Sequence, residues 1–125
     1  MTKATQPLNI EQMTEWLYGR AEEIFLLCCI INRRGLAHAF CDLSGHAEML
    51  DSHIQPIDAS YQTGNFTPPI AKLRLFLRID DDFSEETQQR QYLELQEELD
   101  TYVSYLDYLI ERNEPVTIES QEHAA

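Results

Sequence analysis

Two long segments carry apolar residues at alternating steps of three and four residues, a spacing that keeps one face of an α-helix apolar. Helix-capping residues precede them, Asn9 before the first segment and Ser84 before the second. Gly35 follows the first segment, where a glycine commonly ends a helix. We therefore expect two long helices, over residues 10–33 and 84–112.

Three segments between these helices favour β-strands. Residues 36–42 and 46–54 are expected to pair as a hairpin around a two-residue turn at 44–45. Apolar side chains occupy every second position of residues 71–79, which predicts a strand with one buried face. Proline, glycine and asparagine interrupt residues 55–69, so this segment is expected to be a loop.

These elements define an α+β fold of α-β-β-β-α order, a three-stranded antiparallel meander flanked by two long helices. The length of 125 residues suits a single domain, 1–125, with mobile tails at residues 1–8 and 114–125. The first helix is apolar on every side over residues 24–31, which is typical of a helix that is covered all round. A small sheet leaves much of that surface open, so we expect a homodimer.

The net charge of −13, from 22 acidic and 9 basic residues, argues against direct binding to a nucleic-acid backbone or to an anionic membrane surface. The N-terminus lacks the apolar stretch of a signal peptide, and no apolar run is long enough to span a bilayer. Three cysteines, two of them adjacent, do not form a disulfide framework. These features lead us to expect a cytoplasmic location.

The charge is concentrated in the last third of the chain. Residues 80–122 hold 14 acidic and 2 basic residues, whereas residues 1–79 hold 8 and 7. At 100° per residue, most acids of the second helix lie away from its apolar stripe, together with two tyrosines. Tyrosine is enriched at interface hot spots, so we expect this face to bind a partner. The predicted partner-binding residues are Glu94, Glu97, Glu98, Asp100, Tyr105, Asp107, Tyr108 and Glu111.

The charge density of this segment can be compared with that of nucleic acid. Residues 80–111 carry 11 acids and one base. They span about 45 Å, over which one DNA strand carries about 13 charges and a duplex about 26. One helix approximates a single strand, and two copies in a dimer come closer to a duplex.

The leading interpretation is therefore a non-enzymatic inhibitor, without a cofactor, that occupies a basic or nucleic-acid-binding surface of a partner protein. Small acidic anti-restriction and anti-CRISPR proteins of phages and plasmids are similar to this chain in charge alone. An assembly subunit whose acidic face is merely solvated is an alternative.

A third interpretation is a small metal-binding protein or hydrolase. With a two-residue turn, His38 lies opposite Asp51, and His53 follows on the same face of the hairpin. Imidazole and carboxylate groups together could hold zinc, although their spacing matches no zinc signature. We expect no metal here, with Asp51 acting as a simple partner of a histidine.

The third strand also carries a basic face, formed by Lys72, Arg74 and Arg78 beside Phe76. Such a face could hold a phosphate group, protect an exposed strand edge, or pair with acidic residues. The arginines at positions 33–34 are expected near it.

Overall fold

The computed structural model describes residues 8–123. Its elements follow in the predicted α-β-β-β-α order, with one short helix added at the end. They are α1 (Ile10–Arg34), β1 (His38–Ser44), β2 (Met49–Gln55), β3 (Ala71–Phe76), α2 (Glu85–Arg112) and α3 (Ile118–His123).

The two long helices begin and end within one residue of their predicted limits because their signals are local. The Asn9 side chain accepts the Gln12 N–H at 2.8 Å, and the Gln12 side chain accepts the Asn9 N–H at 3.0 Å, a complete capping box. Gly35 ends α1 in the left-handed conformation, with φ 66°. Ser84 caps α2 by accepting the Thr87 N–H.

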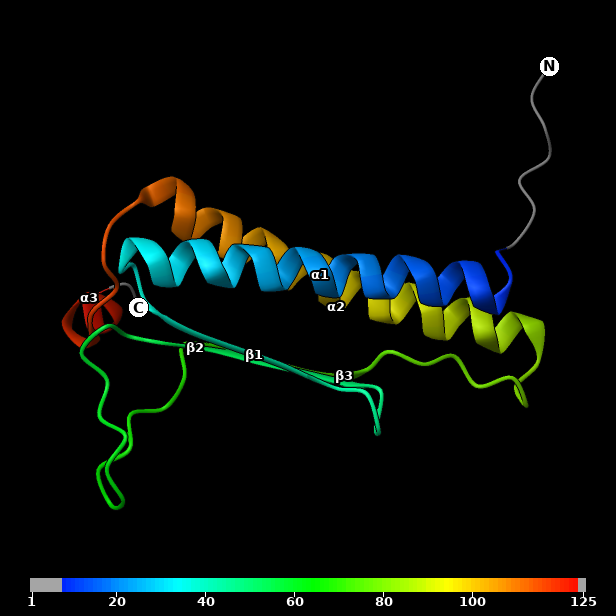
Figure 1. Cartoon of the computed structure of the whole chain (residues 1–125), viewed down its shortest axis with the longest axis horizontal. Coiled ribbons are helices and arrows are strands. Elements are labelled where there is room, and N and C mark those ends of the chain that lie inside the picture. Colours follow the sequence, from blue (N-terminus) through cyan, green and yellow to red (C-terminus); the bar gives the residue numbers. More distant parts are fainter. Residues whose placement is uncertain (1–7, 124–125) are drawn as a thin grey trace.

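The three strands form an antiparallel meander in the order β1-β2-β3. Both long helices pack on the same face of this sheet and run in the same direction (Figure 1). The core lies between the two layers, so the sheet has an inner face covered by helices and an outer face on which residues 8–123 place no helix. The largest fully buried apolar side chains of the core are Met13, Leu17, Ile24, Ile31, Leu50, Ile54, Leu77, Leu99 and Leu106.

The register of the β1–β2 hairpin differs from the predicted one. His38 lies opposite Gln55, and Asp51 lies opposite Asp42. The cause is the connection, which has four residues, 45–48, with Glu48 at φ 54°. Because the partner shifts by an even number of residues, each side chain keeps its predicted side of the sheet.

The segment after α2 is held against the domain. The Val116 N–H donates to the Leu36 carbonyl at 2.7 Å, the Ile57 N–H donates to the Val116 carbonyl at 2.8 Å, and the Val116 side chain is buried. Residues 1–7 and 124–125 of the expected tails lie outside the described residues, and the mobility of the tails stays a prediction.

The apolar segment of α1 is not covered all round within one chain. Leu26 is 60% exposed and Cys29 is also exposed, whereas Ile24, Cys28 and Ile31 are buried. Both the sheet and α2 pack on one side of α1, so the single chain leaves the other side open, and its coverage by a second copy stays a prediction. Within residues 8–123 there is no helix with the length and apolar character needed to cross a bilayer.

Candidate functional site

The predicted acidic surface lies on the outward side of α2. Its heptad stripe, from Tyr92 to Leu109, is buried against α1 and the sheet, so the acidic residues between the stripe positions face solvent. All the predicted partner-binding residues are exposed except Tyr105, which is half-buried. We call the exposed set Glu94, Glu97, Glu98, Asp107, Tyr108 and Glu111, together with Tyr105, the acidic face.

Asp100 has a different position from the rest of the predicted set. It accepts hydrogen bonds from the Arg20 guanidinium of α1, with a distance of 3.0 Å from Nε to Oδ1. This hydrogen bond raises the pKa of Arg20. Asp100 therefore ties α2 to α1, whereas the carboxylates of the acidic face form no ion pair among residues 8–123.

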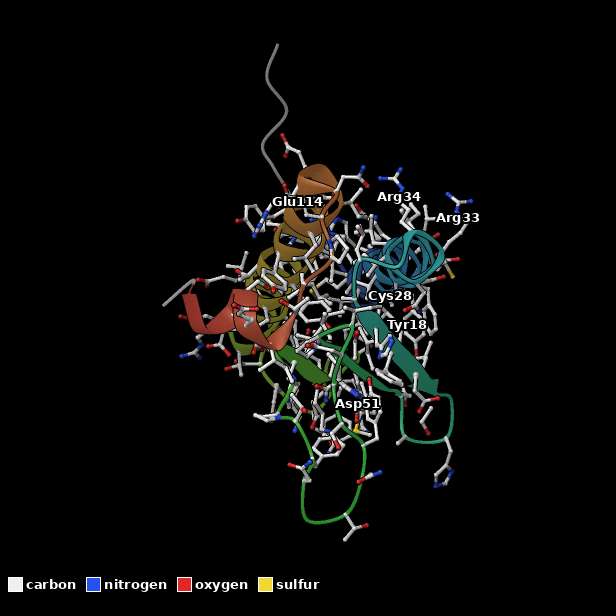
Figure 2. All side chains as sticks on the ribbon, turned by 90° about the vertical axis from the view of Figure 1, so that its left-hand side faces the viewer. Tyr18, Cys28, Arg33, Arg34, Asp51 and Glu114 are labelled. Carbon is white, nitrogen blue, oxygen red and sulfur yellow. The ribbon has the colours of Figure 1, made fainter. Side chains whose placement is uncertain are left out.

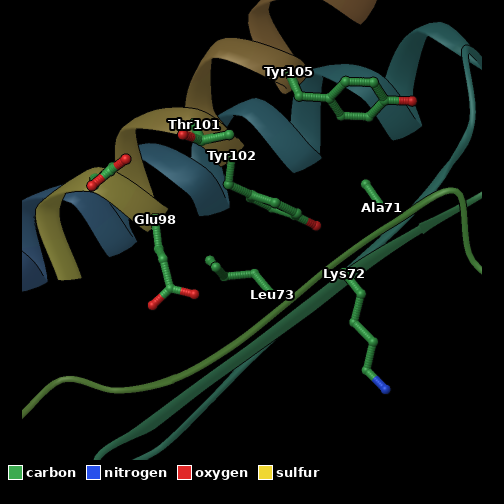
Figure 3. A pocket seen from close by; sticks show the side chains of 8 residues that line it. Ala71, Lys72, Leu73, Glu98, Thr101, Tyr102 and Tyr105 are labelled. Carbon is green, nitrogen blue, oxygen red and sulfur yellow. The ribbon is translucent and has the colours of Figure 1, made fainter. Parts of the chain in front are cut away.

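A groove of about 470 Å³ separates α2 from the free edge of β3 (Figure 3). Leu73 and Tyr102 point into the space between the helix and the strand, and the Lys72 side chain extends away from it (Figure 3). Glu97 and Glu98 line the α2 side of this groove. We call this feature the α2–β3 groove; its lining residues are Ala71, Lys72, Leu73, Glu97, Glu98, Thr101, Tyr102 and Tyr105.

Two tyrosines adjoin the groove and continue along α2. The rings of Tyr105 and Tyr108 have centroids 6.4 Å apart, and the Arg112 guanidinium lies 5.7 Å from the Tyr108 ring centroid. Burial raises the pKa of Tyr105, so its hydroxyl stays neutral and able to donate a hydrogen bond to a higher pH than an ordinary tyrosine hydroxyl. The acidic face thus combines unpaired carboxylates with an aromatic patch.

The metal candidates do not form a ligand set. His38 Nδ1 lies 2.7 Å from the Tyr61 hydroxyl, and the His53 ring stacks on Phe40 with centroids 4.5 Å apart. Asp51 accepts a hydrogen bond from Arg74 at 2.6 Å. Among residues 8–123, the grouping close enough to share an ion is instead residues 80–82, three acids in the turn before α2.

Cys28 is the buried cysteine and lies in the core, Cys41 is half-buried against it, and Cys29 is exposed. Cys28 Sγ is 3.9 Å from Ser52 Oγ, which lies 2.8 Å from the Tyr102 hydroxyl. The hydrogen bond between Cys28 and Cys41 lowers the pKa of Cys28 and raises the pKa of Cys41. Cys28 packs inside the domain, away from the acidic face.

The sequence identified residues of the outer face of the sheet in the hairpin and in β3, but it did not bring them together with the aromatic loop as a second candidate surface. Two cross-strand rows occupy this face, Phe40–His53–Lys72 and Asp42–Asp51–Arg74. The loop between β2 and β3 adds Tyr61 and Phe66, which are 45% and 55% exposed. The available signal was that aromatic residues occur in a predicted loop, but only long-range folding brings them to the sheet.

The arginines at the end of α1 do not belong to this second surface. Figure 2 places Arg33 and Arg34 at the helix side of the molecule and Asp51 at the opposite side. The expectation that they lie near the basic strand face was wrong, because α1 covers the inner face and β3 presents its basic residues on the outer one.

Comparisons with protein-family models, curated proteins and solved structures find no match to this chain. Its function is therefore inferred from the geometry of these two surfaces.

Proposed function

We propose that the protein is a non-enzymatic acidic interaction protein that occupies a basic, nucleic-acid-binding surface of a partner. The observation that carries this proposal is the row of exposed, unpaired carboxylates along α2, next to an aromatic patch and a groove. Carboxylates that already had intramolecular cations would be poor ligands, and among those predicted for binding only Asp100 has one in the described part of the chain.

The α2–β3 groove suits the side chains of arginine and lysine. Its floor includes Leu73 and Tyr102, on which an aliphatic stem can pack, and Glu97 and Glu98 can pair with the charged end group. Tyr105 can donate a hydrogen bond or stack on a guanidinium. A partner surface rich in these cations is one that ordinarily binds phosphate groups.

A homodimer is part of this proposal. α2 has 28 residues and a length of about 42 Å, and its 8 acidic and 2 basic residues give a net charge of −6, about half of the charge that one phosphate strand carries over that length. A second copy would bring the charge close to that of one strand. The exposed apolar side of α1 around Leu26 offers a surface for a second copy. An anti-defence inhibitor encoded by a phage or plasmid is the biological setting that we propose for such mimicry.

The dimer can be tested with two exposed leucines. We expect wild-type protein to sediment at twice the 14.6 kDa chain mass at micromolar concentration, and Leu26→Glu to sediment as a monomer. Leu93→Glu on α2 is the matched control, because Leu93 is 61% exposed and Leu26 is 60% exposed. If the wild-type protein is a monomer, the comparison between the charge of two α2 helices in a dimer and the charge of nucleic acid no longer applies.

The acidic face can be tested by removing three charges. Glu94, Glu97 and Glu98 are replaced by Gln, which changes helix propensity little. Wild-type and variant proteins serve as baits for a host lysate, and association rates are then measured with the captured partner over a range of salt concentrations. We expect the triple variant to associate about tenfold more slowly at low salt and to lose most of the salt dependence.

The control variant removes three exposed acids from α1 by replacing Glu11, Glu15 and Glu22 with Gln. It changes the net charge equally and should keep most of the association rate. A supporting result also requires that duplex or single-stranded DNA competes with the protein for the captured partner. Unchanged affinity and salt dependence in the triple α2 variant would show that the acidic face is only solvated.

A further inference from the structure

The loop between β2 and β3 folds over the outer face of the sheet, on the side away from the acidic face. The Ser60 N–H donates to the Thr67 hydroxyl at 2.9 Å, and the Thr67 N–H donates to the Ser60 carbonyl at 2.9 Å, which closes the loop on itself. Tyr61 reaches His38 of β1, and its ring lies edge-on to Phe66 with centroids 6.0 Å apart. The loop therefore forms a wall beside strand residues of the outer face.

Gln55 is the feature of this region that the fold does not explain. It is fully buried, yet neither Oε1 nor Nε2 has a hydrogen-bond partner within the described chain. A buried amide without partners is destabilising, and native proteins seldom retain one without a role. Gln55 lines a hollow of about 160 Å³ together with His53, Phe66, Pro69 and Lys72. We call this feature the Gln55 hollow.

The lining of the Gln55 hollow specifies the chemistry of a ligand. Both polar atoms of the amide are closed to solvent in this structure, so a ligand reaches them only by displacing side chains that line the hollow. The amide then offers a hydrogen-bond donor and an acceptor side by side, which is the complement of a nucleobase edge. Phe66 offers an aromatic ring for stacking. Lys72 and His53 also line a neighbouring hollow of about 480 Å³. Arg74 of that hollow is already bonded to Asp51, so Lys72 is the cation for an attached anionic group.

We propose that the Gln55 hollow binds the base of a nucleotide, with the Gln55 amide on the base edge, Phe66 against the ring, and Lys72 on the phosphate. The net charge of −13 disfavours a long polyanion, so the ligand carries few phosphates. A free nucleotide and a nucleotide unit of a short single strand share this chemistry. The site shares no residue with the acidic face, although Lys72 also lines the α2–β3 groove.

Binding is measured by titration calorimetry and by amide chemical-shift changes, using the four ribonucleoside 5′-monophosphates as probes. Adenosine lacks the phosphate and ribose 5-phosphate lacks the base, so both should bind at least tenfold more weakly. Shift changes should map to the Gln55 hollow. A single-stranded tetranucleotide tests whether the ligand is a nucleotide unit of a short single strand. If the tetranucleotide binds more tightly than the monophosphates, the ligand is such a strand; if it binds equally or more weakly, the ligand is a free nucleotide.

Three variants test the residues. Gln55→Met and Lys72→Met should each weaken binding at least tenfold, and Arg33→Met, which removes a cation from the other side of the molecule, should leave it unchanged. Gln55→Met should also raise the melting temperature by several degrees, because it removes an unpaired buried amide while keeping the side-chain length.

Several outcomes would overturn this proposal. The absence of binding by all four monophosphates at millimolar concentration is one, and unchanged affinity in Gln55→Met is another. A lower melting temperature in Gln55→Met would mean that enclosed water satisfies the amide and that Gln55 is structural. If Phe66→Ser dissociates a dimer and no nucleotide binds, a second copy covers the face instead.

Discussion

The two faces of the sheet use the same strands for different purposes. On the inner face, Ser52 is fully buried and has partners, because it donates to the Phe40 carbonyl at 2.8 Å and contacts the Tyr102 hydroxyl. On the outer face, Gln55 of the same strand is equally buried and has none within the described residues. The inner face is thus a completed core. The outer face keeps exposed aromatic rings and a buried amide without partners among the described residues, and the nucleotide proposal rests on this difference.

The largest expected difference between the faces concerns neighbouring residues of β3. Leu75 is buried on the inner side, and Phe76 is 59% exposed on the outer side. Leu75→Ala should lower the free energy of unfolding by about 2–5 kcal/mol because it leaves a cavity. Phe76→Ala should cost less than about 1 kcal/mol. Urea denaturation checks both values, and equal losses would mean that the outer face is also packed.

In the second comparison, one substitution on each face should change the free energy of unfolding in opposite directions. Ser52→Ala should lower the free energy of unfolding by about 1–3 kcal/mol, because the Phe40 carbonyl and the Tyr102 hydroxyl lose their partner. Gln55→Met should raise it by a similar amount, about 1–3 kcal/mol. Thermal and urea unfolding of the two variants measure this contrast directly. A loss in both variants would show that the Gln55 amide is satisfied in solution.

The third prediction concerns alkaline pH on the inner face. Burial raises the pKa of Tyr102 above its ordinary value of 10.0. Because the folded state holds the proton more tightly than the unfolded state, the stabilisation is fully present below pH 10 and is lost as the pH rises further. Tyr102→Phe should therefore flatten the decline in unfolding free energy above pH 10 while lowering stability at neutral pH. An unchanged alkaline slope would contradict this assignment, and Tyr108→Phe on the exposed face is the control.

The smallest expected effect is the ion pair of the outer face. Arg74 and Asp51 are bonded at 2.6 Å, but the Arg74 side chain is 60% exposed. A double-mutant cycle with Arg74→Met and Asp51→Asn should give a coupling below about 1 kcal/mol at physiological salt. A substantially larger coupling would mean that this row is shielded from solvent, for example by a second copy.

The sequence by itself determined the two long helices and the strand residues that face the core. Apolar spacing, the Asn9 and Ser84 caps and the glycine after α1 act within a few residues, so their consequences are local and predictable. The side of the sheet taken by each strand residue was equally predictable, since alternation survives an even shift in register. The acidic face followed from the same periodicity, because residues between the buried positions of α2 must face solvent.

Only the tertiary structure decided the hairpin partners and the architecture of the outer face. The four-residue connection moved the partner of His38 from Asp51 to Gln55, which separated the metal candidates. The loop between β2 and β3 places Tyr61 against His38, and its residues Phe66 and Pro69 lie beside the buried Gln55. Both outcomes depend on contacts between residues far apart in the chain, and the loop carries no periodic pattern to indicate where it packs. Val116 is a further example of a position set by distant contacts. Its backbone is held by hydrogen bonds to Leu36 and Ile57, and no feature of its neighbours in sequence indicates that it is buried.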